Sequence, residues 1–215
     1  MGKGRVIILG KGESALRCDV DFVNTFDKVV ICNYPVLKGY EKNFPYKADI
    51  WYRNKSCKNL TKQEFEKLGI KEVVYTGQPN TKLCNDECYD AKVSYPDWWS
   101  ICKKDYDLDP NTGLQAFLDL VEQKYDSICL VGFDMQSKGT KPYFFDKKEA
   151  PENLKYLWNS GHYNNDTINF VSGHNPDKSF DVIKMKIKEN TNIDFIIISN
   201  YKKFYNLGYS NLKVL

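Results

Sequence analysis

The chain has 215 residues, of which 42% are hydrophobic and 14% aromatic, and this suffices for the core of one globular domain. Its net charge of +3, carried mostly by lysines, argues against a protein that binds nucleic acid. No apolar run approaches the ~18 residues of a membrane span, and an apolar strand near the start leaves no room for a signal peptide. The seven scattered cysteines predict reduced thiols in a cytoplasmic protein.

A short apolar strand and two glycines open the chain. Residues 6–9 carry four consecutive apolar side chains, which is typical of a strand buried on both faces. Gly10 and Gly12 then allow a tight turn around Lys11, and we expect Ser14 to cap a short helix. A strand, a glycine turn and a helix start together predict an anion site, most often for a nucleotide phosphate. An ordinary turn without a ligand is the alternative.

The end of the second predicted strand, residues 28–32, bears on the kind of nucleotide. Domains that bind nicotinamide dinucleotides carry an acidic residue there, which holds the ribose. This chain has Asn33 instead, with no Asp or Glu beside it. A third predicted strand, residues 49–52, is followed closely by Asn54. The pattern argues against a nicotinamide cofactor and predicts a nucleotide site lined by amides.

The middle of the chain combines a clear helix with a long irregular stretch. Thr61 and Glu64 form a capping box for a helix that ends at Gly69, and residues 71–75 predict the next strand. Residues 77–110 are polar and rich in Asn, Cys and aromatic side chains. A stretch of this length is usually functional or carries short helices, whose places the pattern does not indicate.

Regular alternation of helix and strand resumes in the second half. Apolar spacing predicts a helix over residues 112–124, a strand over 127–131, a helix beginning at Asn175-Pro176 and a last strand over 193–198. We interpret residues 135–173, which are irregular, as a lid-like insertion. Strands alternating with helices predict one α/β domain over residues 1–215, with a parallel central sheet.

Two groups of residues have the composition of metal ligands. Asp107 and Asp109 imitate the Asp-x-Asp pair of metal-dependent nucleotide-sugar transferases, although such a pair before a proline is more often a solvated loop. Four cysteines could in principle form a zinc site, but their spacing is irregular and no histidine lies near them: Cys57, Cys84, Cys88 and Cys102. We therefore expect no metal site.

Five segments, taken in order, resemble the bacterial sialyltransferases of glycosyltransferase family 42 and, more distantly, the family 29 enzymes. They are GKGES, CNYP, WYRN, NTGLQAFLDL with ICLVGFDM, and GHNPDKSFDVIK. The resemblance covers most of the chain but not residues 77–109. It implies a single Rossmann-like domain of the GT-A-like sialyltransferase type with a small lid. It also implies metal-independent, inverting transfer of sialic acid from CMP-sialic acid to a glycan hydroxyl, without a cofactor.

The resemblance also assigns roles to individual residues. Those expected to bind the CMP-sugar donor are Gly10, Lys11, Gly12, Ser14, Asn33, Asn54, Asn111, Thr112, Gly113 and Asp134. His174 matches the general base, and Tyr143 matches a tyrosine on the leaving phosphate. His162 is a weaker candidate for the acceptor side. The expected partners are a nucleotide-sugar donor and a glycan acceptor, and a homo-oligomer stays open.

Several positions depart from the family pattern. Lys11 replaces the usual Asn, Glu13 replaces Pro, and Asp109 stands where an Arg is expected. A second phosphate-binding tyrosine is replaced by Met135 or Gln136. Two alternatives therefore stay open. One is a metal-dependent transferase that uses another nucleotide sugar, and the other is a catalytically silent CMP-binding module.

Overall fold

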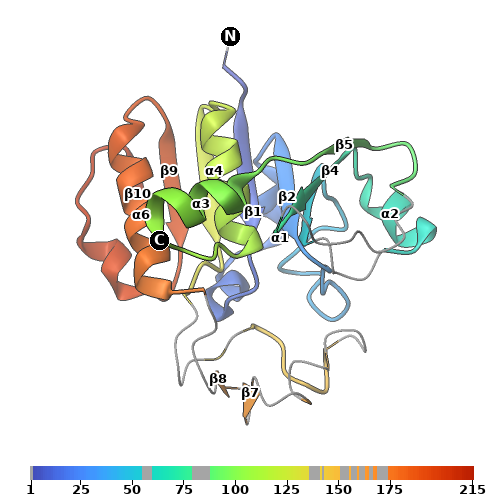
Figure 1. Ribbon diagram of the computed structural model, residues 1–215. Coiled ribbons are helices and arrows are strands. Elements are labelled where there is room, and N and C mark those ends of the chain that lie inside the picture. The colour runs from blue at the N-terminus through green and yellow to red at the C-terminus, as the bar shows by residue number, and fades with distance from the viewer. Residues whose placement is uncertain are drawn as a thin grey trace.

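The computed structural model describes residues 2–54, 60–78, 88–135, 141, 143–150, 155, 159, 163–164, 167–168 and 174–215. These residues form an α/β domain on an eight-stranded parallel sheet of order β10-β9-β6-β1-β2-β3-β4-β5 (Figure 1). The strands of this sheet are β1 (Arg5–Leu9), β2 (Lys28–Cys32), β3 (Ile50–Asn54), β4 (Glu72–Thr76), β5 (Lys92–Ser94), β6 (Ser127–Val131), β9 (Asp194–Ile198) and β10 (Leu212–Val214). An antiparallel pair, β7 (Tyr163–Asn164) and β8 (Thr167–Ile168), lies apart from it.

Helices cover both faces of the sheet. The α-helices are α1 (Val20–Asn24), α2 (Lys62–Leu68), α3 (Trp98–Tyr106), α4 (Thr112–Glu122) and α6 (Pro176–Glu189). Two 3₁₀ helices are η1 (Glu13–Arg17) and η3 (Lys202–Asn206). Among the described residues, no helix is both long enough and apolar enough to cross a membrane.

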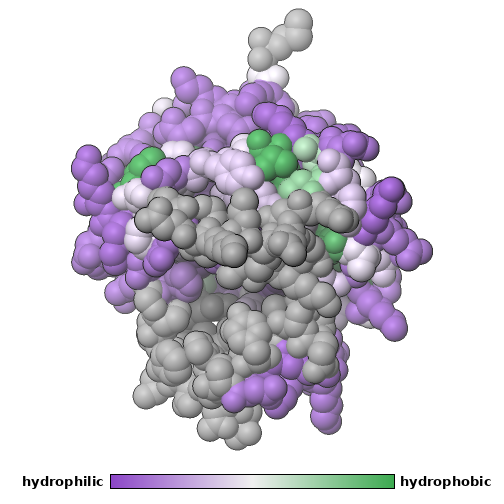
Figure 2. Space-filling model, turned by 45° about the vertical axis from the view of Figure 1, so that its right-hand side comes forward, coloured by the Kyte–Doolittle hydropathy of each residue, from purple (hydrophilic) through white to green (hydrophobic). Residues whose placement is uncertain are grey.

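The alternation of side chains along β1 shows why the domain has two cores. Val6 and Ile8 pack with α3, α4 and α6 on one face, whereas Ile7 and Leu9 pack with α1 and α2 on the other. All four are buried, as expected for a central parallel strand. Full burial of such a side chain stabilises a fold by about 1.5–3 kcal/mol. The surface drawn in Figure 2 is accordingly mainly hydrophilic, with separate small apolar spots.

The strand order places a topological switch point at the centre of the sheet. The chain runs from β1 outward through β2, β3, β4 and β5, then crosses back to β6 on the opposite side of β1. Ligands of open α/β sheets bind outside the carboxyl ends of the strands at such a point. In Figure 1 the described parts of residues 141–168 lie beyond this edge of the sheet.

The structure confirms the α/β class, the parallel sheet and every predicted strand and helix outside residues 135–173. Thr61 and Glu64 form the predicted capping box, and Gly69 ends α2 with a positive φ. Asn175 caps α6, with Pro176 in its first turn. The segment interpreted as a lid falls largely outside the described residues. Among the described residues, seven elements were not predicted: α1, β5, α3, β7, β8, η3 and β10.

Candidate functional site

Four of the predicted site residues lie at one edge of the sheet. Gly10 follows β1, Asn33 follows β2, Asn54 ends β3, and Asp134 comes three residues after β6. These strands are neighbours in the order β6-β1-β2-β3, so the predicted common edge is observed. The individual roles of these residues stay predictions.

The glycine turn packs against the end of β6. The Gly10 N–H donates to Val131 O (2.7 Å), and the Gly12 N–H donates to Gly132 O (3.0 Å). A Cβ on either glycine would come within 2.6 Å of a carbonyl oxygen on this segment, so both positions exclude a side chain. The glycines thus bring two backbone segments of the protein together.

Ser14 does not cap the helix that follows the turn, contrary to the prediction. The N-cap of η1 is Gly12, and Ser14 lies inside the 3₁₀ helix, fully buried. Its N–H donates to Asp134 Oδ2 (2.8 Å), and its hydroxyl lies 2.5 Å from Asp134 Oδ1. The charged Asp134 carboxylate is a stronger acceptor than the neighbouring backbone carbonyls, so Ser14 bonds to it in the interior of the protein and does not cap the helix.

Asp134 connects three segments at the switch point. Besides the two bonds from Ser14, its Oδ1 accepts a hydrogen bond from the Asn200 N–H (2.8 Å), just beyond β9. The Ser199 hydroxyl lies 3.3 Å from the same oxygen. In this structure the hydrogen bonds of Asp134 therefore link the loops that follow β1, β6 and β9.

A second polar cluster joins the ends of β2, β3 and β4 to the start of α4. Asn33 Oδ1 accepts from the Asn54 N–H (2.9 Å) and from the Thr112 hydroxyl (3.2 Å). The Thr112 hydroxyl has one hydrogen, so Thr76, 3.2 Å away, donates to it. The structure thus brings Asn33, Asn54 and Thr112 together. The proximity of the two asparagines was expected, because each lies at the end of a predicted strand.

Backbone geometry and capping support this cluster. Asn33 has a φ of +54°, a conformation that Asn tolerates better than most residues. Asn111 caps α4 by accepting from the Leu114 N–H (2.8 Å). A Cβ on Gly113 would lie 3.2 Å from the Phe133 ring, so this helix packs closely on the loop after β6.

Gln115 belongs to the same cluster, and the sequence reasoning missed it. It is buried, and its amide accepts from the Gly77 N–H (3.2 Å) and donates to Pro110 O (3.1 Å). A polar residue among the buried positions of α4 was the signal that could have revealed it.

We expect Thr112→Val to lower the free energy of unfolding by about 0.5–1.5 kcal/mol, because it removes the hydroxyl that links Asn33 to Thr76 at nearly constant volume. The melting temperature should fall by roughly 1–6 °C. Thr191→Val, at an exposed turn position, is the matched control and should change stability little. Equal melting temperatures for the two variants would contradict a stabilising role for the cluster.

His174 lies at the start of α6, beside the turn that precedes α4. Its Nδ1 is 2.8 Å from Asp109 O. A carbonyl oxygen can only accept, so Nδ1 carries the hydrogen and Nε2 of the neutral ring keeps its lone pair. The ring is exposed. The arrangement therefore leaves Nε2 as a proton acceptor on an exposed residue. Asp109, which holds the other ring nitrogen, lies two residues before Asn111, the cap of α4.

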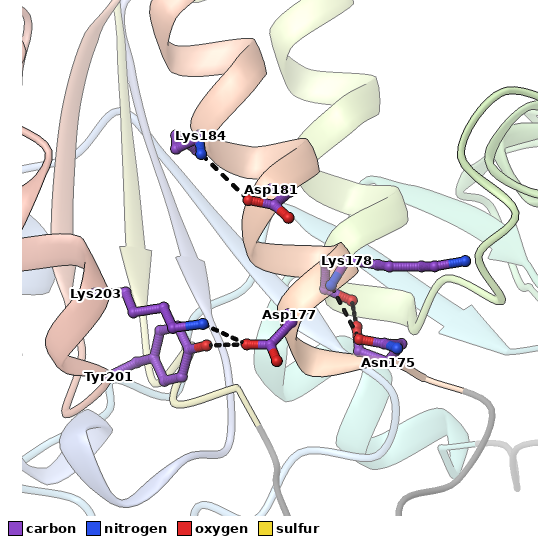
Figure 3. Close-up of polar contacts among 8 residues, drawn as sticks. Asn175, Asp177, Lys178, Asp181, Lys184, Tyr201 and Lys203 are labelled. Carbon is purple, nitrogen blue, oxygen red and sulfur yellow. Dashed lines mark hydrogen bonds and ion pairs between the residues drawn. The ribbon is translucent and has the colours of Figure 1, made fainter.

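Ion pairs on both sides hold the start of α6 in place. Asp177 accepts from Lys203 Nζ and the Tyr201 hydroxyl, each at 2.7 Å (Figure 3). Lys178 Nζ donates to the carboxylate (2.8 Å) and the carbonyl (2.9 Å) of Asp107. These contacts fix the start of α6, which directly follows His174 and Asn175, against η3 and against the turn before α4.

The two aspartates that imitate a metal-binding pair contact lysines. Lys178 holds the pKa of Asp107 below its usual range through a hydrogen bond and its charge. Lys103 Nζ lies 3.1 Å from Asp109 Oδ1. Among the described residues, no group of three His, Cys, Asp or Glu side chains is placed to hold a metal ion. Cys88 and Cys102 carry free thiols, whereas Cys57 and Cys84 lie outside the described residues.

Tyr143 lies close to the glycine turn. Its ring stacks on Phe145 with centroids 4.9 Å apart, and Lys11 Nζ is 6.0 Å from the Tyr143 centroid. The neighbouring Phe144 N–H donates to Lys11 O (2.8 Å). These two contacts with Lys11 hold residues 143–145 against the turn that follows β1. His162 and Gln136 lie outside the described residues.

The chain was compared with protein families, curated proteins and solved structures. No family model and no curated protein matches it. Solved sialyltransferases of Campylobacter jejuni do match. The enzyme CstII in complex with the substrate analogue CMP-3FNeuAc shares 16% identity at a TM-score of 0.63, over 91% of this chain and 81% of that one. The monofunctional α-2,3-sialyltransferase Cst-I shares 15% sequence identity at a TM-score of 0.59, over 91% of this chain and 76% of that one.

The fold is that of these sialyltransferases. A further structure of CstII, in complex with a trisaccharide acceptor and CMP, matches at a TM-score of 0.57 and 15% identity, over 90% of this chain and 80% of that one. The likeness confirms the Rossmann-like, GT-A-like domain expected from the five sequence segments. At this level of identity the likeness is one of fold.

Proposed function

We propose that the protein is a sialyltransferase that moves sialic acid from CMP-sialic acid to a glycan hydroxyl with inversion and without a metal ion. The observation that carries the proposal is the fold, which is shared over 91% of the chain with an enzyme solved in complex with a CMP-sugar analogue. The common edge formed by Gly10, Asn33 and Asn54 supports it, because open α/β sheets bind nucleotides there.

In the proposed reaction, Nε2 of His174 takes the proton of the acceptor hydroxyl, whose oxygen attacks the anomeric carbon of sialic acid. The bond from that carbon to the phosphate oxygen breaks, and CMP leaves with the bonding electrons. The Tyr143 hydroxyl donates a hydrogen bond to the departing phosphate and stabilises its charge. The Nδ1 contact with Asp109 O supports this role for His174, since it leaves Nε2 as the acceptor.

Binding of nucleotides tests the proposal directly. We expect calorimetry to detect CMP binding in the presence of EDTA, with weaker binding of UDP and GDP. Saturation with CMP at about 100 times its dissociation constant should stabilise the fold by about 2.7 kcal/mol. Binding of UDP or GDP alone, and only with Mg²⁺ or Mn²⁺, would favour the metal-dependent alternative. CMP binding without any transfer or hydrolysis of CMP-sialic acid would indicate a silent binding module.

A further inference from the structure

The glycine turn has few backbone N–H groups left for a phosphate. The N–H groups of Gly10, Gly12 and Ser14 all donate to oxygens of residues 131–134. The following helix, η1, is a single five-residue 3₁₀ segment and supplies no helix dipole of useful length. A phosphate at this turn therefore needs its positive charge from a side chain.

Lys11 is the cation that the turn itself carries. Its neighbours Gly10 and Gly12 pack closely on the backbone at the end of β6, and this fixes the backbone at Lys11. Its carbonyl accepts from the Phe144 N–H (2.8 Å), and its ammonium lies 6.0 Å from the centre of the Tyr143 ring. Lys11 and Tyr143 therefore reach the same space from different parts of the chain.

The surroundings of Lys11 are largely apolar. A pocket between the ends of β1 and β2 is lined by Lys11, Ile31, Cys32, Val36 and Phe144, among others. Burial raises the pKa of the Cys32 thiol to about 12, while the nearby charge of Lys11 acts in the opposite direction. Apolar walls weaken screening by water, so the attraction between an ammonium and an anion is stronger here than on an open surface.

We infer that the Lys11 ammonium binds the phosphate of the nucleotide in the proposed donor site, together with the Tyr143 hydroxyl. The inference rests on the proposed function and adds a phosphate-binding residue to it. It gives physical meaning to one departure from the family pattern, because the lysine stands where the resemblance leads us to expect an amide.

The test compares CMP with cytidine, which lacks the phosphate. Calorimetry in EDTA on Lys11→Met should show CMP affinity reduced by about 10- to 100-fold, the usual worth of a charge-assisted hydrogen bond, with cytidine affinity unchanged. Lys11→Arg keeps the charge and should stay within a few-fold of wild type. Lys38→Met, at an exposed position near the pocket, removes the same net charge and should leave both affinities unchanged.

Three results would overturn the inference. They are an equal loss for CMP and cytidine, no loss for either ligand, or a loss confined to CMP-sialic acid, which would place Lys11 on the sugar carboxylate. If Lys11→Met does not fold, Lys11→Gln replaces it in the same comparison. A wild-type protein that binds neither CMP nor CMP-sialic acid would instead overturn the proposed function on which the inference rests.

Discussion

Replacing His174 with alanine should lower the rate of sialyl transfer by about 10²–10⁴-fold, the usual contribution of a general base. CMP affinity and the melting temperature should stay close to wild type. Little of the fold depends on the His174 ring, because it is exposed and its Nδ1 contacts a backbone carbonyl, that of Asp109. The measurements are initial rates of transfer from CMP-sialic acid, CMP binding by calorimetry, and thermal unfolding.

Two further variants separate the role of His174 from other losses. Tyr143→Phe removes a hydrogen-bond donor to the leaving phosphate, so it should slow both transfer and the hydrolysis of CMP-sialic acid. His174→Ala should slow transfer more than hydrolysis, because water does not need the acceptor site. His162→Ala should alter acceptor use at most. Full activity in His174→Ala would end the proposed mechanism, and equal losses from both histidine variants would leave the base unassigned.

The fold was predictable where local signals and burial agree. Residues 6–9 are apolar without interruption because β1 is central and covered on both faces. The helices α2 and α6 carry their own caps, Thr61 and Asn175, so the sequence marks where they begin. Each of these elements can therefore be recognised from its own residues, without knowledge of its distant contacts.

Apart from α3, which has nine residues, the missed elements are short and depend on tertiary contacts. β5 has three residues at the edge of the sheet, none of them buried, so it lacks the apolar run of the inner strands. α1 has five residues and follows a 3₁₀ helix, which leaves no helical period to detect. β10 likewise has three residues, and among the described strands it pairs with β9 alone. Such segments acquire regular structure from the neighbour that they pair with or pack on.

The candidate site was predictable in its place but not in its hydrogen bonds. Asn33 and Asn54 follow adjacent parallel strands, whose carboxyl ends share one edge, so their proximity follows from topology. That Asn33 would also accept from Thr112 depends on how α4 packs, about 80 residues later in the chain. The resemblance assigned Ser14 and Asp134 to a ligand, whereas the structure pairs them with each other.

This pairing makes Asp134 a residue whose loss should destabilise the fold. Asp134→Ala leaves the N–H groups of Ser14 and Asn200 and the Ser14 hydroxyl without their charged acceptor. The Ser14 hydroxyl keeps a second acceptor, Ile198 O (3.1 Å), and the exposed Asn200 N–H can bond to water. The cost therefore falls mainly on the buried Ser14 N–H, and we expect a loss of about 1–3 kcal/mol in the free energy of unfolding. The melting temperature should then fall by roughly 2–12 °C.

The control for this variant is Asp126→Ala, at the opposite end of β6. Asp126 is exposed, and its carboxylate accepts from the Gly4 N–H (2.9 Å), so its loss should cost about 1 kcal/mol or less. Asp134→Asn keeps the shape and part of the accepting capacity, and its stability should fall between wild type and Asp134→Ala. Asp134→Ala that melts like wild type but no longer binds CMP would contradict the structural role. Asp134 would then act by direct contact with the CMP-sugar, as the family resemblance implies, and the three loops would need another connection to hold the switch point together.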